Sequence, residues 1–214
     1  MTDLTHRGQT LLQDLDGFSI EVDEKRERAD IILRRPPLNV ISMHARDQLR
    51  AAFEALDEDD RVRVIVVRAN GEHFSSGGDI KGFLEASPEH VSKLAWNIAA
   101  PARCTKPVIA ANRGFCFGVG FELSLACDFR IATDTTFYAL PEQKLGQIPG
   151  SGGSAKGNLC FASKARIWMS PNRSCPVTCA STVEFRPGGR ATNCRITPWP
   201  TLIPSSQDCP GETR

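Results

Sequence analysis

The chain has 214 residues, of which 41% are hydrophobic and 24% charged, and its formal net charge is +1 at pH 7. This length and composition predict one ordinary globular domain with a buried core and room for a small appendage. A net charge near zero excludes a global field that would attract nucleic acid or an anionic membrane, so we expect neither kind of partner. No apolar run approaches the roughly 20 residues that a membrane helix needs, and we expect a cytoplasmic protein.

The eight cysteines are distributed unevenly along the chain. Three lie in apolar segments, at Cys104, Cys116 and Cys127, and the other five follow position 155. Free cysteine in apolar surroundings behaves as a small hydrophobe, so the first three are predicted to pack in the core rather than to form a disulfide framework.

The first part of the chain shows the alternating elements of an α/β protein. Residues 1–16 are predicted to be a loosely held lead-in, and the patterns of 18–22 and 29–33 indicate a β-hairpin. Ser42 is placed to cap a helix that reaches about residue 57. The nearly continuous β-branched run at 62–67 is typical of a strand that is buried on both faces.

The alternation of predicted helices and strands continues after residue 86. Ser87, Pro88 and Glu89 have the order of an N-cap, an N1 proline and an early acid, and predict a helix to about residue 100. The remaining predicted elements are a strand at 106–111, a helix at about 117–127 and short strands near 129–132 and 137–140.

Two glycine-rich segments follow predicted strands. In 111–123, a strand leads through glycines into a helix that carries Glu122, and the free N–H groups at such a helix start favour a developing negative charge. Taken alone, Gly118 and Gly120 are better explained by close helix–strand packing. The second segment, 74–81, follows a buried strand, where α/β sheets place ligands.

Three segments in this order and at this spacing resemble the enoyl-CoA hydratase/isomerase, or crotonase, family. They are 74–81, 114–128 and 141–150, and the resemblance extends over roughly residues 17–155. It implies an α/β crotonase-like fold built from repeated ββα units, with 17–155 as an acyl-CoA-binding core. The family expectation for assembly is a homotrimer or a dimer of trimers.

The same resemblance assigns roles to residues. The backbone N–H groups of Gly78 and Val119 correspond to the two donors of an oxyanion hole for the thioester oxygen, and Glu122 and Glu142 to the paired acid/base glutamates of the hydratases. Many relatives have glycine at the position of Val119, but a backbone donor tolerates valine at a helix start. Residues that correspond to contacts with CoA or with the catalytic water are Ser76, Ile80, Lys81 and Gly150.

These residue types suit the hydration of a 2-enoyl-CoA. The transition state is enolate-like, so donors aimed at the thioester oxygen stabilise it, while two carboxylates on one water can take and deliver protons. Coenzyme A is expected as part of the substrate, with no separate cofactor and no metal. A thioester hydrolase or an isomerase of the same family remains an alternative, and Phe115, Phe117 and Phe121 belong either to the core or to an acyl pocket.

The pattern changes abruptly after residue 155. Residues 156–214 hold five of the eight cysteines and seven of the fourteen prolines, without a sustained helical or strand period. We interpret this tail as aberrant, for example from a shifted reading frame, which translation in the other frames would test. A zinc module is disfavoured, since the tail lacks a paired Cys-x-x-Cys and has no histidine. A catalytically incompetent CoA-binding chain is therefore a further alternative.

Overall fold

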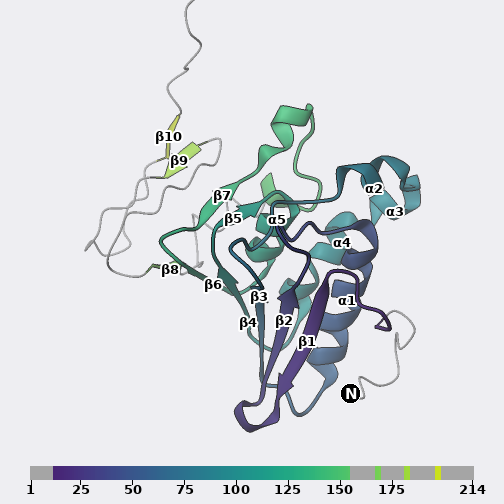
Figure 1. Cartoon of the computed structure of the whole chain (residues 1–214), viewed down its shortest axis with the longest axis vertical. Helices are drawn as coiled ribbons and strands as arrows, with labels where there is room; N and C mark the ends of the chain where they lie inside the picture. The colour runs from purple at the N-terminus through teal and green to yellow at the C-terminus, as the bar shows by residue number, and fades with distance from the viewer. Residues whose placement is uncertain (1–11, 155–166, 170–180, 184–195, 199–214) are drawn as a thin grey trace, which may run out of the picture.

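A computed structural model describes residues 12–154 and three short strands at 167–169, 181–183 and 196–198 (Figure 1). Within these residues no helix is long and apolar enough to cross a membrane. The elements of the first part are β1 (Phe18–Asp23), η1 (Glu24–Arg26), β2 (Arg28–Leu33), α1 (Met43–Glu58), β3 (Val64–Ala69), α2 (Ile80–Glu85), α3 (Pro88–Ser92), α4 (Leu94–Ile98) and η2 (Ala100–Arg103). Those that follow are β4 (Val108–Asn112), β5 (Phe115–Phe117), α5 (Val119–Ala126), β6 (Phe129–Ala132), β7 (Phe137–Ala139), η3 (Pro141–Leu145), β8 (Ile167–Met169), β9 (Ser181–Val183) and β10 (Ile196–Pro198).

One six-stranded sheet organises the fold, with strand order β1-β2-β3-β4-β6-β8. The hairpin of β1 and β2 is antiparallel, as the sequence predicted, and the remaining pairs are parallel. A second sheet pairs β5 with β7 in parallel, and β5 was not predicted as a strand. The order ββα occurs at β1–β2–α1 and again at β4–β5–α5, as expected for a crotonase-like fold.

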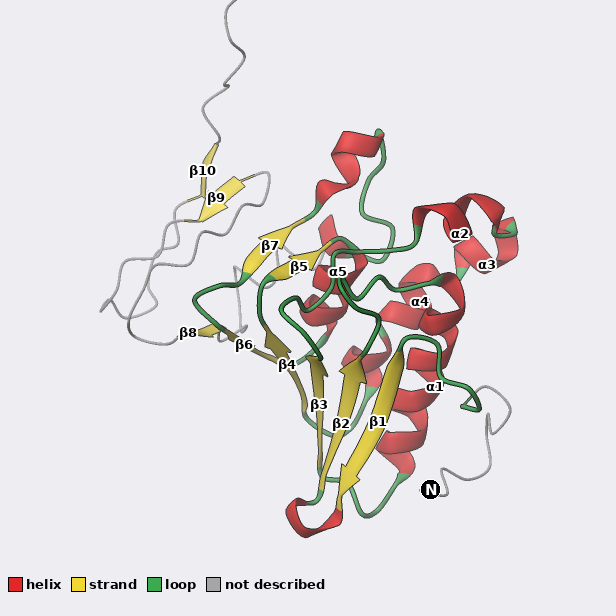
Figure 2. Cartoon of the chain, in the orientation of Figure 1, coloured by secondary structure: helices red, strands yellow, loops and turns green. Residues whose placement is uncertain are grey.

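Helix α1 lies along one face of the sheet (Figure 2). Ser42 caps it by accepting a hydrogen bond from the Ala45 N–H at 3.0 Å, as predicted. Its apolar side chains at Leu49, Phe53 and Leu56 are buried together with inward-facing residues of the strands. This burial stabilises the scaffold from which the loops at the carboxyl ends of the strands project.

Several predicted elements differ from the structure. The helix expected at 87–100 is divided into α3, α4 and η2, with Lys93 between the first two. Strand β3 buries one face fully and the other only partly, because Arg68 lies among its outward residues and reaches a surface network. The end of the lead-in is anchored rather than loose: the Asp16 N–H donates to Gln48 at 2.7 Å, and the Asp16 carboxylate contacts Arg35 and Ser42.

The tail contains the three-residue strands β8, β9 and β10, although the sequence predicted no regular element there. Strand β8 pairs in parallel with β6 at the edge of the main sheet, and β9 pairs with β10 in an antiparallel ribbon. The five tail cysteines considered for a zinc module all lie outside the described residues. Cys116 and Cys127 are buried and Cys104 is partly buried, and all three are free thiols, as predicted.

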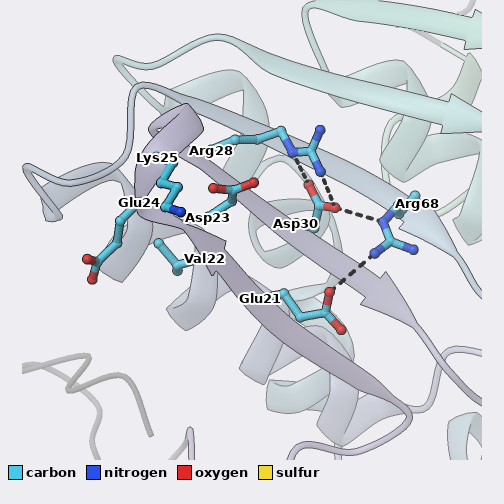
Figure 3. A pocket seen from close by; sticks show the side chains of 8 residues that line it. All are labelled: Glu21, Val22, Asp23, Glu24, Lys25, Arg28, Asp30 and Arg68. Carbon is cyan, nitrogen blue, oxygen red and sulfur yellow. Dashed lines mark hydrogen bonds and ion pairs between the residues drawn. The ribbon is translucent and has the colours of Figure 1, made fainter.

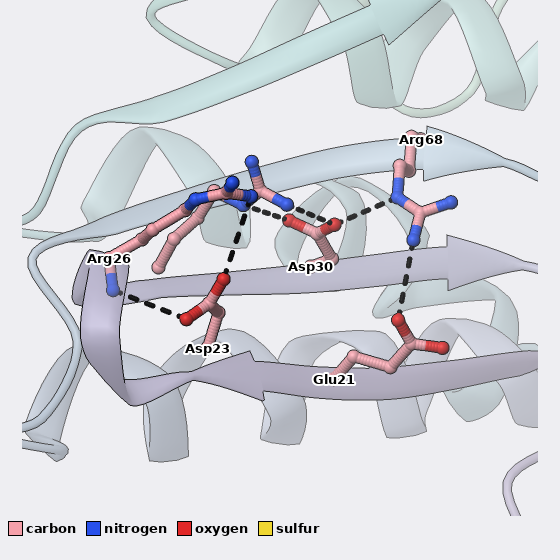
Figure 4. A network of polar contacts seen from close by, with 6 residues as sticks. Glu21, Asp23, Arg26, Asp30 and Arg68 are labelled. Atoms are coloured by element: carbon pink, nitrogen blue, oxygen red, sulfur yellow. Dashed lines mark hydrogen bonds and ion pairs between the residues drawn. The ribbon is translucent and has the colours of Figure 1, made fainter.

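An ion network covers the outer face of the hairpin and β3 (Figures 3 and 4). Asp30 is only 4% exposed and lies between two arginines, with 2.8 Å from Arg28 Nε to its Oδ1 and 2.8 Å from Arg68 Nε to its Oδ2. Arg68 also reaches the exposed Glu21 at 3.4 Å. A surface hollow of about 540 Å³ lies over this network. Because Asp30 joins adjacent strands, the network holds β2 and β3 together on the face opposite α1.

We expect Asp30→Asn to lower the free energy of unfolding by about 1–3 kcal/mol, because Arg28 and Arg68 both lose the carboxylate with which they pair. Glu21→Gln removes only an exposed ion pair and should cost about 0–1 kcal/mol. Urea unfolding of both variants measures the difference. Equal losses of unfolding free energy in the two variants would show that the buried ion pairs of Asp30 stabilise the protein no more than the exposed pair of Glu21.

Candidate functional site

The N-terminus of α5 presents free backbone donors. Gly118 is the N-cap, with a left-handed φ of 51° that favours glycine, and its own N–H donates to the Ala139 carbonyl at 2.9 Å. No side chain caps the helix, and among the described residues the Val119 N–H has no acceptor. An unpaired N–H at a helix start is suited to bind a negatively charged oxygen.

The Gly78 N–H is the second free donor. The Ile41 N–H donates to the Gly77 carbonyl at 2.9 Å, and the Asp79 N–H donates to the Ile41 carbonyl at 3.1 Å. These two bonds fix the peptide on either side of Gly78, whose own N–H has no acceptor in the described part of the chain. A methyl group placed on Gly78 would lie 3.6 Å from Val119 Cγ1, so the structure brings the two predicted oxyanion residues together.

Glu122 lies one turn into α5, is only 2% exposed and is held by the main chain. Its Oε1 accepts hydrogen bonds from the N–H groups of Ser151 at 2.8 Å and Gly153 at 2.9 Å. The sequence analysis missed Ser151 and Gly153 as functional residues. The only signal was their place in the run Gly-Ser-Gly-Gly that follows Pro149.

Glu142 lies in the first turn of η3, beside the same helix start. A methyl group on Gly118 would be 3.0 Å from Glu142 Oε1, which places this carboxyl against the N-cap of α5. Burial raises the pKa of Glu142, and the nearby charge of Glu122 raises it further. Its Oε2 is buried and has no hydrogen-bond partner in the described structure. The two predicted glutamates are therefore neighbours, one bonded to the main chain and one with an oxygen free.

Arg46 is a charged residue of this region that the sequence analysis did not identify. It lies in the first turns of α1, is 6% exposed, and its Nη2 would be 2.4 Å from a methyl group on Gly78. Burial lowers the pKa of Arg46, while the charge of Glu122 opposes that shift. Helical spacing on α1 marked the apolar face and gave no signal that this arginine points inward.

The residues predicted to contact CoA lie around the glycine-rich segment. Ser76 donates its N–H to the Leu38 carbonyl at 2.8 Å, and Ile80 begins α2 with 55% of its surface exposed. Lys81 follows it and is also exposed. Gly150 is exposed and directly precedes Ser151, and its expected role toward a water stays a prediction.

The aromatic residues left open by the sequence divide between two places. Phe121 is buried and packs against Tyr138, with ring centroids 4.9 Å apart, so it belongs to the core. Phe115 stacks between His73 and Phe117, at 4.0 and 4.8 Å. A hollow of about 410 Å³ lies against His73 and Phe115, and neither glutamate of the site lines it.

This arrangement combines two free N–H donors with a pair of carboxyl groups. The donors can stabilise negative charge on a carbonyl oxygen, and the carboxyl groups can exchange protons with a molecule held beside it. No cluster of side chains that could hold a metal ion is present in the described residues.

Comparison with known proteins identifies the family of the chain. The family described as enoyl-CoA hydratase/isomerase matches residues 24–158. A carnitinyl-CoA dehydratase of Salmonella arizonae is 39% identical over 128 residues, which are 58% of this chain and 49% of that protein. A carnitinyl-CoA dehydratase of Proteus mirabilis is 35% identical over 139 residues, or 63% of this chain and 53% of that protein. The chain thus spans about half the length of these relatives.

Solved structures show the same relationship. An enoyl-CoA hydratase subunit of Geobacillus kaustophilus superposes with a TM-score of 0.62 at 30% identity, covering 70% of this chain and 58% of that one. DspI of Pseudomonas aeruginosa superposes with a TM-score of 0.63 at 28% identity, covering 71% and 60%. The chain therefore belongs to the enoyl-CoA hydratase/isomerase family.

Proposed function

We propose that the chain is a hydratase-type lyase that adds water to a 2-enoyl-CoA thioester. The observation that carries the proposal is the pairing of Glu122 and Glu142 beside the free N–H groups of Gly78 and Val119. Family members share the use of a CoA thioester, and the retention of two carboxyl groups favours chemistry on water within that class. The carnitinyl-CoA dehydratases among its relatives are lyases of a related kind by name.

The two glutamates suit different proton transfers. Both partners of Glu122 Oε1 are N–H donors, so this oxygen acts as an acceptor, which suits the carboxylate that takes a proton from water. Burial and the charge of Glu122 raise the pKa of Glu142, so Glu142 more readily holds the proton that is delivered to the α-carbon. The oxygen of water adds to the β-carbon while the proton reaches the α-carbon.

The proposed oxyanion donors act on the carbonyl oxygen of the thioester. As water adds, negative charge moves onto the thioester oxygen, and the N–H groups of Gly78 and Val119, which have no acceptor within the described residues, can receive it. Loss of one such donor typically costs about 10²–10³ in rate. Ser76, Ile80 and Lys81, next to Gly78 in the chain, are proposed to contact the CoA moiety, and Gly150 to help hold the water.

Glu122→Gln and Glu142→Gln test the reaction. Each is expected to lower the rate of hydration about 10²–10⁴-fold, because an amide neither accepts nor delivers the proton. The loss of the enoyl absorbance measures hydration, and a thiol reagent measures CoA release in parallel. The matched control is Glu58→Gln at the exposed C-terminal end of α1, which should keep full activity. Thiol release without hydration would replace the hydratase by a thioester hydrolase.

The raised pKa of Glu142 also predicts a pH dependence of stability. A carboxyl that binds its proton more tightly when folded stabilises the protein at low pH, and this stabilisation is lost as pH rises from about the ordinary value of 4.5 through the raised folded pKa. Glu142→Gln removes the titration, so its free energy of unfolding should fall less than that of the wild type across this window. Urea unfolding at several pH values measures both slopes, and identical slopes would contradict the prediction.

A second candidate is a CoA-binding chain without catalytic activity. It is favoured by the exposed apolar side chains Phe129 and Ile131 on one face of β6, which are 45% and 46% exposed. A homotrimer of the family kind would be one way to cover such residues. Size-exclusion chromatography with light scattering separates the candidates: an active trimer supports the hydratase, and an inactive monomer or aggregate supports the second candidate.

A further inference from the structure

Within the described residues, the largely buried side chain of Arg46 has no hydrogen-bond or ion-pair partner for its guanidinium. The residue is 6% exposed, its Nε is buried without a hydrogen bond, and within the described residues the guanidinium forms no ion pair or hydrogen bond. An arginine remains charged at any ordinary pH, and burial of an unpaired charge is costly. A fold that retains such a group at a reaction site supplies a place for an anion from outside the chain.

The nearest acidic side chains are engaged elsewhere. The charges of Glu122, Asp47 and Asp79 act on Arg46, but none lies within ion-pair distance in the described structure. Asp47 Oδ2 is 2.7 Å from His90 Nε2, and its Oδ1 accepts from Asn97. Asp79 caps α2, and Glu122 is held by two backbone N–H groups. Arg46 therefore lies in an acidic neighbourhood without being neutralised by direct contact.

Gly78 makes the space that the guanidinium occupies. Its φ is not in the left-handed region, so the backbone does not require glycine at this position. A methyl group there would lie 2.4 Å from Arg46 Nη2, closer than atoms can approach. Because Gly78 has no side chain, the guanidinium of Arg46 can lie directly against this residue, whose N–H is a proposed oxyanion donor.

We propose that Arg46 is a charged member of the oxyanion site, whose guanidinium stabilises the negative charge that forms on the thioester oxygen. The inference rests on the proposed function, because it uses the same oxyanion and the same donors. Arg46 transfers no proton and forms no covalent bond. It also defines a substrate class: a buried guanidinium disfavours acyl groups that place a cation near the thioester and accepts neutral or anionic ones.

Acetoacetyl-CoA is a direct probe of this charge. Its α-carbon loses a proton to solvent, and the resulting enolate has an ultraviolet band that the keto form lacks. The wild-type chain should raise the enolate fraction of the bound probe. Arg46→Met should lower the enolate-to-keto ratio about 10- to 100-fold, and Arg46→Lys, which keeps a charge, should retain most of it.

Arg50→Met is the matched control. Arg50 lies one turn further along α1 and pairs with the exposed Glu54 at 2.7 Å, so the same substitution removes a positive charge from the same helix without reaching the site. Its enolate fraction should equal that of the wild type. Circular dichroism of all variants reports whether each one folds.

A second arm separates a direct role from one exerted through Glu122. In a Glu122→Gln background, Arg46→Met should still lower the enolate fraction by the same factor, because the stabilised charge is on the ligand. If the effect disappears in that background, Arg46 acts only by positioning Glu122 and the proposal is wrong. An unchanged enolate fraction in folded Arg46→Met also overturns it.

The outcomes for the proposed function are distinct. If the wild type neither binds the probe nor raises its enolate fraction, both the oxyanion site and the role of Arg46 are refuted. If the enolate effect of Arg46 is present but no enoyl-CoA is hydrated, the hydratase assignment fails and the role of Arg46 stands.

Discussion

The close approach of α5 to the segment that ends in Gly78 is the contact on which the site depends. Gly120 makes it possible, because a methyl group there would lie 2.5 Å from Ser75 Cβ. The Ser75 backbone bonds to both ends of β5, accepting from Phe117 and donating to Phe115 at 2.9 Å each. Main-chain bonds and direct packing thus hold α5 and residues 75–78 together. The distance between the two free N–H groups follows from the scaffold and needs no ligand to set it.

The same packing concentrates charge in a buried volume. Glu122, Glu142 and Arg46 come from α5, η3 and α1, and no two are near in the sequence. Electrostatic interactions are stronger where water is excluded. The charge of Glu122 therefore raises the pKa of Glu142 and opposes the lowering of the pKa of Arg46 by burial. Glu122 is held by the main chain at Ser151 and Gly153, so its orientation depends on the loop after η3 as much as on α5.

The sequence predicted best what depends on local pattern. Alternation and helical spacing located the β1–β2 hairpin and α1 nearly to the residue. The three linked motifs selected Gly78, Val119, Glu122 and Glu142, whose catalytic roles stay predictions. The helix after Ser87 was predicted too long, since periodicity does not show a break such as that at Lys93. Ser151 and Arg46 were missed because they contact residues far away in the sequence. Ser151, for example, bonds to Glu122, 29 residues earlier. The pattern of a single sequence does not reveal such contacts.

The absence of a side chain at Gly78 leaves room for the branched side chain of Val119. Valine brings a branched side chain to the first helical position of α5, and its helical backbone keeps the N–H available despite that bulk. Gly78 has no side chain, and the space next to its Cα is shared by Val119 Cγ1 and Arg46 Nη2. A larger residue at 78 would have to displace the guanidinium or the valine. The shape and the charge of the proposed oxyanion site are therefore coupled through Gly78, because a larger side chain at any of the three positions leaves less room for the other two.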